Sequence, residues 1–267
     1  MKTYNLVFFH TEGPPRDKGH NLTESRDIII NGAKPYMDNI TYYNPRILKE
    51  MGFEYFVKEY EDLGCCTNPN FHKLGFAAWK SLIIKLELEK LNEGDILLYR
   101  DSNTFHYPPY ADYTDVKKVI DFNLNHCNFD FFMPRETEDI KLKQHCKTNI
   151  IRELGEDHPF TYEFPLLASG FIAMKKSKIS VELVDEWVKG SENKEWSTGK
   201  VYGDLHPTFE WSTPEQAILG VIIANWIRKR KYNIPINYPN LIMGLHKNEV
   251  ILNRIPENYE YLKLLEN

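Results

Sequence analysis

The chain alternates short, wholly apolar runs with longer segments in which apolar residues recur every three or four positions. Runs of the first kind predict buried strands, and segments of the second kind predict amphipathic helices. The predicted strands cover residues 6–10, 95–99, 129–133 and 170–174. The predicted helices cover residues 23–33, 76–91 and 114–124, and a further helix begins at residue 214. This alternation predicts an α/β fold rather than separate all-α and all-β parts.

The ends of two predicted helices carry recognised signals. The helix over 76–91 runs toward Gly94, and a glycine soon after the last turn is a common C-cap. Before the last predicted helix, Thr213 stands at the N-cap and Gln216 at the N3 position. A hydroxyl and an amide at this spacing predict a capping box.

Polar stretches over 189–203 and around 238–247 predict long loops that border a site. Strand and helix patterns alternate from one end of the chain to the other, without an internal repeat. We therefore expect one domain over residues 1–267.

Composition excludes several classes of protein. Of the 267 residues, 42% are hydrophobic and 13% are aromatic, which is ample for a core and excludes a disordered chain. The 33 Lys and Arg against 38 Asp and Glu leave a net charge of -5, which provides no general attraction to nucleic acid or anionic lipid. No apolar run is long enough for a membrane span or a signal-peptide core. We therefore expect a cytoplasmic protein with no nucleic-acid partner and no membrane span.

The four cysteines, Cys65, Cys66, Cys127 and Cys146, form no CxxC pair and are too few for a disulfide scaffold. We expect reduced thiols. Metal binding by the adjacent Cys65 and Cys66 is an alternative, although no His or Cys follows at zinc spacing.

The turn after the predicted strand at 95–99 carries the most informative chemistry. Asp101 and Asn103 alternate with Ser102, so two side-chain oxygens could converge on one cation. Ligands of open α/β sheets bind beyond the carboxyl ends of strands. Oxygen ligands suit Mg²⁺ or Mn²⁺, which would act as a Lewis acid on a substrate diphosphate. The alternative is an ordinary turn, because Asp, Ser and Asn are common turn residues.

Several motifs together resemble a known family. They are Trp79-Lys80 on a predicted helix, Gly94-Asp95 at the start of the strand, Tyr99-Arg100-Asp101-Ser102-Asn103 at its end and in the turn after it, and Tyr107-Pro108. This series resembles GT-A-type nucleotide-sugar-dependent glycosyltransferases of bacterial polysaccharide clusters and large DNA viruses, including the glycosyltransferase domain of a chlorella-virus protein. The resemblance implies a single GT-A-like domain with a mixed, mainly parallel sheet flanked by helices. Its Rossmann-like half, residues 1–110, would bind the nucleotide sugar, and residues 111–267 would bind the acceptor.

The resemblance also implies roles for individual residues. In such enzymes a DxD motif holds a divalent metal on the donor diphosphate, and here its last position is an asparagine. The implied metal ligands are Asp101, Asn103 and His246, with Mn²⁺ or Mg²⁺ as cofactor. The implied donor-binding residues are His10, Thr11, Trp79, Lys80, Arg100, Asp101, Ser102, Lys147, Ser169 and Gly170.

Glu215 matches the acidic position of an Asp-Gln pair in many glycosyltransferases, which implies that Asp101 and Glu215 are the catalytic carboxylates. Glu215 also suits the first turn of a helix for electrostatic reasons alone. On the acceptor side we expect Asp204, His206, Trp211 and Gln216, because Trp faces stack well on sugar rings. The ordinary alternatives are a solvated helix position for Lys147 and a surface histidine for His246.

The expected function is metal-dependent transfer of a sugar from a nucleoside diphosphate sugar, most simply a UDP-sugar, to a hydroxyl of a glycan or glycoprotein acceptor. This chemistry belongs to polysaccharide or glycan biosynthesis. One alternative is a non-catalytic carbohydrate- or nucleotide-binding protein, which Asn103 favours. The other is a sugar nucleotidyltransferase, although the glycines near the first strand make a poor phosphate loop.

Overall fold

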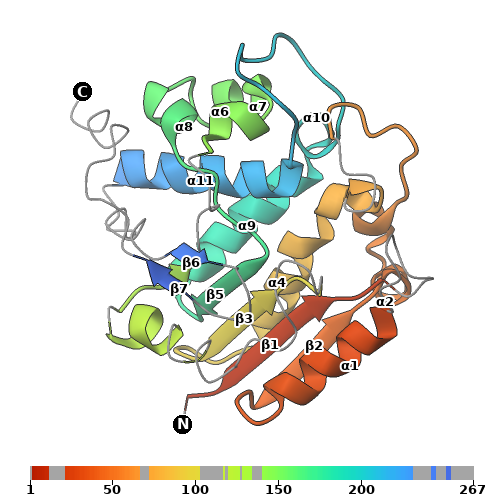
Figure 1. Cartoon of the computed structure of the whole chain (residues 1–267), viewed down its shortest axis with the longest axis vertical. Coiled ribbons are helices and arrows are strands. Elements are labelled where there is room, and N and C mark those ends of the chain that lie inside the picture. The colour runs from red at the N-terminus through yellow and green to blue at the C-terminus, as the bar shows by residue number, and fades with distance from the viewer. Residues whose placement is uncertain are drawn as a thin grey trace.

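The computed structural model describes residues 2–11, 22–66, 72–102, 117, 120–126, 128–133, 140–230, 242–244 and 251–253. A five-stranded sheet with the strand order β2-β1-β3-β5-β4 forms its centre (Figure 1). The strands are β1 (Tyr4–Phe9), β2 (Asn39–Tyr43), β3 (Ile96–Arg100), β4 (Phe131–Phe132) and β5 (Phe171–Lys175). A separate antiparallel pair consists of β6 (Ile242–Gly244) and β7 (Ile251–Asn253).

Four strands of the central sheet run in one direction, and β5 runs against them. Strand β1 pairs in parallel with β2 and with β3, whereas β5 pairs antiparallel with both β3 and β4. The predicted α/β class, with a mixed, mainly parallel sheet flanked by helices, is therefore confirmed. Strand β2 was not among the predicted strands, because its sequence, Asn-Ile-Thr-Tyr-Tyr, is not a continuous apolar run and only its last residue, Tyr43, is buried.

Helices connect the strands and cover the sheet. The α-helices are α1 (Leu22–Ala33), α2 (Pro45–Glu50), α4 (Trp79–Lys90), α6 (Leu142–His145), α7 (Thr148–Glu153), α8 (Pro159–Glu163), α9 (Lys178–Glu192), α10 (Lys194–Ser197) and α11 (Pro214–Arg230). Shorter turns of other helix types are η1 (Glu54–Val57), η2 (Gly75–Ala77) and η3 (Asp121–His126). In the part of the chain described here, no helix is long and apolar enough to cross a membrane.

Alternate residues of β1 belong to two different hydrophobic layers. Leu6 and Phe8 pack in a cluster with Ile29 of α1. Val7 and Phe9 pack in a larger cluster on the other face, which α4, α9 and α11 complete. Because side chains of a strand alternate between faces, one wholly apolar strand supplies both layers.

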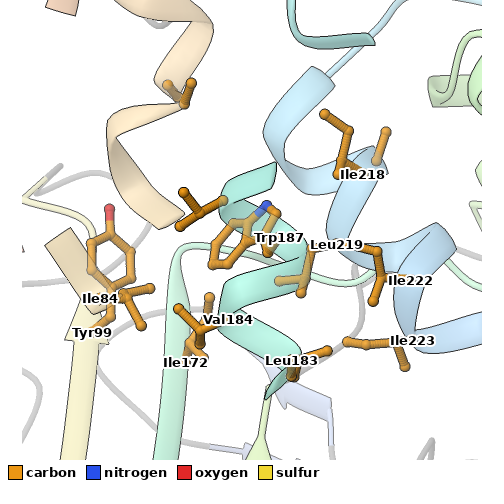
Figure 2. Close-up of a cluster of buried hydrophobic side chains, with 14 of the residues drawn as sticks. Ile84, Tyr99, Ile172, Leu183, Val184, Trp187, Ile218, Leu219, Ile222 and Ile223 are labelled. Atoms are coloured by element: carbon orange, nitrogen blue, oxygen red, sulfur yellow. The ribbon is translucent and has the colours of Figure 1, made fainter. Parts of the chain in front are cut away.

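Helix α9 packs between α4 and α11 in the larger layer (Figure 1). Trp187 of α9 is fully buried there and lies near Ile84 of α4 and Ile218 of α11 (Figure 2). This layer ties together segments that lie far apart in the sequence, and it therefore sets where the first turns of α4 and α11 lie.

The strand order creates a point at which neighbouring connections leave the sheet on opposite faces. After β1 the chain forms α1 over one face and returns to β2, and after β2 it forms α4 over the other face and returns to β3. Strands β1 and β3 are adjacent, so their carboxyl ends border the crevice in which ligands of open α/β sheets bind. His10 follows β1 at this edge, and Asp101 follows β3.

The helix predicted over 76–91 is shorter than expected at both ends. Phe76 and Ala77 have φ angles of 49° and 59°, so the regular helix begins only at Trp79. Leu91 takes an extended conformation after the last turn, and the predicted C-cap role of Gly94 is therefore wrong. Gly94, with φ of 86°, lies in the turn before β3, where its N–H donates to the Lys176 carbonyl at 2.9 Å.

The predicted loop over 189–203 is also wrong in its first half, because α9 continues to Glu192 and α10 follows it. The apolar side chains of α9 lie on one buried face, and the Ser177 hydroxyl accepts a hydrogen bond from the Ser180 N–H at 3.2 Å at the helix start. Polar composition alone misled the prediction, since α9 carries its charges on its outer face.

The start of α11 is correctly predicted, but its capping box is not formed. The Ala217 N–H donates to the Thr213 carbonyl at 2.8 Å, which makes Thr213 the N-cap residue. Its hydroxyl, however, has no hydrogen-bond partner among the described residues. The Gln216 amide donates instead to the Leu167 carbonyl at 2.5 Å, because α11 packs beside the segment that enters β5.

Candidate functional site

Four polar side chains from distant parts of the sequence meet at the carboxyl end of β3. The Lys80 ammonium on α4 lies 3.0 Å from the Ser169 Oγ and 3.3 Å from Glu215 Oε1. It also lies 3.4 Å from Asp101 Oδ1. The Ser169 hydroxyl in turn lies 3.4 Å from Glu215 Oε1. We call Lys80, Asp101, Ser169 and Glu215 the lysine-carboxylate cluster.

The cluster is almost wholly buried, with one open side. The side chains of Lys80 and Glu215 are 0% and 1% exposed, whereas that of Asp101 is 12% exposed. One ammonium faces two carboxylates, so the ionised cluster carries a net negative charge. A buried charge is costly unless it is paired, and Lys80 supplies the pairing for both carboxylates. Asp101 is therefore the member best placed to meet a ligand from solvent.

Neighbouring elements hold each member in place. The Asp101 N–H donates to the Gly170 carbonyl at 2.8 Å, which joins the end of β3 to the residue before β5. The Tyr99 hydroxyl donates to Asp101 Oδ1, and the Tyr99 ring lies 5.5 Å from the Lys80 ammonium. At the first turn of α11, the Trp187 indole N–H donates to the Glu215 carbonyl at 2.8 Å. The carboxyl end of β3 and the contact between α9 and α11 therefore hold the site in place.

Two residues of this region were given no individual role from the sequence, although Tyr99 stands in the motif around Asp101. Tyr99 stands two positions before Asp101 on β3, and this spacing places both side chains on the same side of the strand, a signal that was available. His72 is fully buried and interacts electrostatically with Glu215 and Lys80. Burial lowers the pKa of His72, and the Glu215 carboxylate only partly opposes this. No motif around His72 in the sequence pointed to it.

Lys147, expected to meet a phosphate, has a different environment. Its ammonium is fully buried and donates to the backbone carbonyls of Glu195, Thr198 and Lys200 at 2.5, 2.7 and 3.1 Å. These three bonds use all three of its N–H donors. Lys147 therefore binds the 195–200 segment, and its ammonium has no donor left for a phosphate.

The remaining donor-side residues lie near the ends of β1 and β3. Trp79 stacks on Phe9 with ring centroids 3.8 Å apart and an interplanar angle of 15°, so its ring is part of the core. Its indole nitrogen is buried and has no hydrogen-bond partner among the described residues. His10 is buried directly after β1, and its backbone N–H donates to the Tyr43 carbonyl at 2.8 Å. Thr11 is partly exposed.

Arg100 and Ser102 flank Asp101 and differ in environment. Arg100 is buried, and its Nε lies 3.4 Å from the Asp101 carbonyl oxygen. Ser102 is partly exposed beside it. Gly170 supplies the carbonyl that binds the Asp101 N–H, as described above. Of the implied donor residues, Lys80, Asp101 and Ser169 are thus brought into direct contact.

The residues expected on the acceptor side lie along the segment before α11. His206 Nδ1 lies 2.8 Å from the Thr208 hydroxyl, and its ring is 5.6 Å from that of Tyr162. Trp211 packs edge-on against His145, with ring centroids 4.3 Å apart. Asp204 is exposed. Gln216, which binds the Leu167 carbonyl, is the acceptor-side candidate next to Glu215 in the sequence.

The described residues fit a divalent cation only in part. Asp101 supplies hard oxygen donors, but Lys80 and Tyr99 already bind its Oδ1 atom. The other two implied ligands, Asn103 and His246, lie outside the described residues, as do Tyr107 and Pro108. In the described ranges, no group of three or more His, Cys, Asp or Glu side chains has the arrangement of a metal site.

Several buried polar atoms near the start of α11 have no partner within the described residues. They include Glu215 Oε2, Ser212 Oγ and Thr213 Oγ1, and the side-chain oxygen and nitrogen of Asn149 on α7. Helix α7 packs against α11, and the Thr213 N–H donates to the carbonyl of His145, the last residue of α6, at 3.3 Å. Each buried polar group left without a partner costs about 1–3 kcal/mol. Water or a polar ligand that binds these atoms would recover this free energy.

Comparison of the sequence with models of protein families finds no match, and comparison with curated proteins finds none.

Proposed function

We propose that this protein is a glycosyltransferase with a GT-A-like fold that uses a nucleoside diphosphate sugar as donor. The observation that carries the proposal is the lysine-carboxylate cluster at the carboxyl end of β3, beside the residues that enter β5. Ser169 and Glu215 follow Lys80 by 89 and 135 residues in the sequence, and yet both lie within hydrogen-bond distance of its ammonium. Their place beyond the carboxyl end of β3 is where open α/β sheets bind nucleotides.

The cluster supplies the groups that glycosyl transfer requires. The Lys80 ammonium lies between two carboxylates and holds both in place, and its positive charge would act through space on a diphosphate bound beside Asp101. Glu215 has one carboxylate oxygen bound by Lys80 and Ser169 and a second, Oε2, without a described partner. This second oxygen suits an acceptor hydroxyl, whose proton it would take as general base.

A divalent metal, Mn²⁺ or Mg²⁺, belongs to this proposal. Bound through Asp101, it would neutralise charge on the donor diphosphate as a Lewis acid. The donor is most simply a UDP-sugar, and the acceptor is a hydroxyl of a glycan or glycoprotein. The hydroxyl groups of Ser212 and Thr213 and the side-chain amide of Asn149 have no hydrogen-bond partner among the described residues, and they suit a ligand rich in hydroxyl groups.

A screen of nucleotide sugars for donor hydrolysis, with and without Mn²⁺, tests the proposal. We expect at least one donor to release sugar in a metal-dependent reaction. Asp101→Asn and Glu215→Gln preserve the shape of each side chain and remove its charge, and each should lower the rate about 100-fold or more. Glu87→Gln is the matched control, because Glu87 is also a buried carboxylate, bound by Tyr43 at 2.6 Å and far along α4 from Lys80.

Other outcomes distinguish the alternatives. No donor hydrolysis, together with no effect of any nucleotide sugar on the melting temperature, would overturn the proposal. Stabilisation by nucleotide sugars without release of sugar would favour a binding protein. Release of pyrophosphate from a nucleoside triphosphate and a sugar phosphate would identify a nucleotidyltransferase.

A further inference from the structure

A second group of reactive side chains surrounds Lys147, separate from the lysine-carboxylate cluster. The thiols of Cys65, Cys66 and Cys146 all interact electrostatically with the Lys147 ammonium. All three cysteines are free, and Cys65 is the partly exposed one, whereas Cys66 and Cys146 are buried. A positive charge near a thiol favours its ionised, nucleophilic form, so this group of thiols is a candidate reactive site.

The backbone holds Cys65 and Lys147 on one short segment. The Cys65 N–H donates to the Gly199 carbonyl at 2.8 Å, and Lys147 binds the carbonyls of Thr198 and Lys200 on either side. The Cys66 N–H donates to the Leu63 carbonyl at 3.0 Å, which closes a turn over residues 63–66. The backbone N–H groups of both cysteines are therefore held by hydrogen bonds to described residues.

Within this frame the two adjacent thiols differ in acidity. A hydrogen bond from the Cys66 thiol lowers the pKa of Cys65 to about 7, and the Lys147 charge acts in the same direction against the effect of burial. The same hydrogen bond, together with burial, raises the pKa of Cys66. Cys65 is thus ionised to a large extent at neutral pH, and the thiolate is the form of cysteine that attacks electrophiles.

We propose that Cys65 and Cys66 form a reactive dithiol, in which a peroxide oxidises Cys65 and Cys66 then closes a reversible disulfide. In the first step the Cys65 thiolate attacks one oxygen of hydrogen peroxide. The O–O bond breaks, and a sulfenic acid and hydroxide form. In the second step the Cys66 sulfur attacks the Cys65 sulfur, the S–O bond breaks, and the hydroxyl leaves with a proton as water. Two thiols lose two electrons in total, and one peroxide is reduced to two waters.

The product would be easily reduced. Consecutive Cα atoms are about 3.8 Å apart, below the usual Cα separation of bridged cysteines of about 4.4–6.8 Å. Strained and accessible disulfides have the more oxidising potentials of labile or regulatory bonds. A dithiol reagent should therefore restore both thiols.

The dithiol is also connected to the start of α11. The Ser212 N–H donates to the Cys65 carbonyl at 3.0 Å, three residues before Glu215, and the Glu215 charge acts on the Cys66 thiol. Closing the disulfide would change the turn on which this bond depends. The proposal does not depend on the function proposed above, because it rests on the thiols and Lys147 alone.

Treatment of the full chain with hydrogen peroxide, followed by tryptic peptide mass measurement, tests this inference. Residues 59–73 form one tryptic peptide that contains both cysteines. We expect this peptide to lose two hydrogens and to regain them with dithiothreitol. In Cys66→Ser the resolving thiol is absent, so dimedone should label a sulfenic acid on Cys65. Cys146→Ser, the matched control, should oxidise like the wild type.

Alkylation measures the reactivity of Cys65 independently. In the wild type, the rate with iodoacetamide should reach half of its maximum near pH 7. Cys66→Ala removes the hydrogen bond to Cys65 and should slow alkylation at pH 7 about tenfold. A peptide 59–73 that is unchanged by peroxide while Cys127 or Cys146 oxidises, or that gains oxygen without losing hydrogens, would overturn the proposal.

Discussion

Two fully buried lysines illustrate how much the surroundings decide the role of a residue. Lys80 faces the carboxylates of Asp101 and Glu215, whereas Lys147 faces three backbone carbonyls and a group of thiols. The sequence suggested the same donor-binding role for both. Only the first has the charged partners and the place at the sheet edge that such a role requires. The second cross-links the 195–200 segment to the start of α7.

Replacement of Lys147 by methionine tests this structural role. The apolar stem remains, but three carbonyls lose a charged donor, so we expect the free energy of unfolding to fall by about 3 kcal/mol. Urea denaturation measures this change. Lys143→Met is the matched control, because Lys143 forms only a partly exposed ion pair with Glu163 and should lose less than about 1 kcal/mol. Equal losses in the two variants would contradict the assignment.

At the scale of elements, one close backbone contact between two loop segments holds the turn that carries Cys65. The turn over 63–66 lies directly against residue 199, where a Cβ atom would stand 1.6 Å from the Leu63 carbonyl oxygen. The absence of a side chain at Gly199 thus allows the approach that places Cys65 beside the segment that Lys147 binds. This contact joins the turn after η1 to the segment after α10.

Gly199→Ala should therefore be strongly destabilising. The added methyl group meets backbone atoms, which cannot rotate away, and we expect a loss of more than about 2 kcal/mol in the free energy of unfolding. Gly203→Ala is the control, because nothing lies within 4 Å of its added Cβ and only its φ of 76° opposes the change. Its cost should be about 1 kcal/mol. Thermal unfolding followed by circular dichroism compares the two variants.

At the scale of the whole molecule, the carboxyl end of a central strand and one helical layer together form the candidate site. The strand order places β3 in the middle of the sheet, and the α4–α9–α11 layer carries Lys80 and Glu215 to its carboxyl end. The buried His72 lies within the same charge system. Folding therefore places a neutral imidazole beside charged groups, and this has a consequence for the dependence of stability on pH.

We predict that His72 makes the protein less stable in mild acid. Burial lowers its folded-state pKa below the unfolded value of 6.5, so the unfolded state binds the proton more readily. Its contribution to stability is complete above about pH 6.5 and is lost as the pH falls through the lower folded-state pKa. One such proton adds a slope of at most about 1.4 kcal/mol per pH unit.

Melting temperatures of His72→Gln between pH 7 and pH 5 check this prediction. The variant should lose less stability than the wild type over this range. His206→Gln, on the turn before α11, is the control and should follow the wild type. A wild-type pH dependence in His72→Gln would contradict the prediction.

The sequence alone was sufficient for the fold class, for four strands of the central sheet and for helices α1, α4 and α11, but it missed β2 and the helices from α6 to α10. Strands β1, β3 and β5 and helix α11 were predicted from runs and periods of apolar residues, because burial imposes a local repeat on the chain. Local signals were less reliable at helix ends. Gly94 looked like a C-cap but lies in the turn before β3, and Thr213 is the N-cap residue of α11 without the predicted capping-box hydrogen bonds.

The candidate site was only partly within reach of the sequence. Local motifs singled out Lys80, Asp101, Ser169 and Glu215 one by one, and no local pattern could show that they meet. The tertiary structure decided this, because strand order and the α9–α11 contact determine which distant segments become neighbours. It also decided that Lys147 binds carbonyls and that the thiols of Cys65 and Cys66 lie beside a buried cation. The pattern of apolar residues along the chain is a local property, whereas the charged partners of a side chain come from distant segments that only the fold brings together.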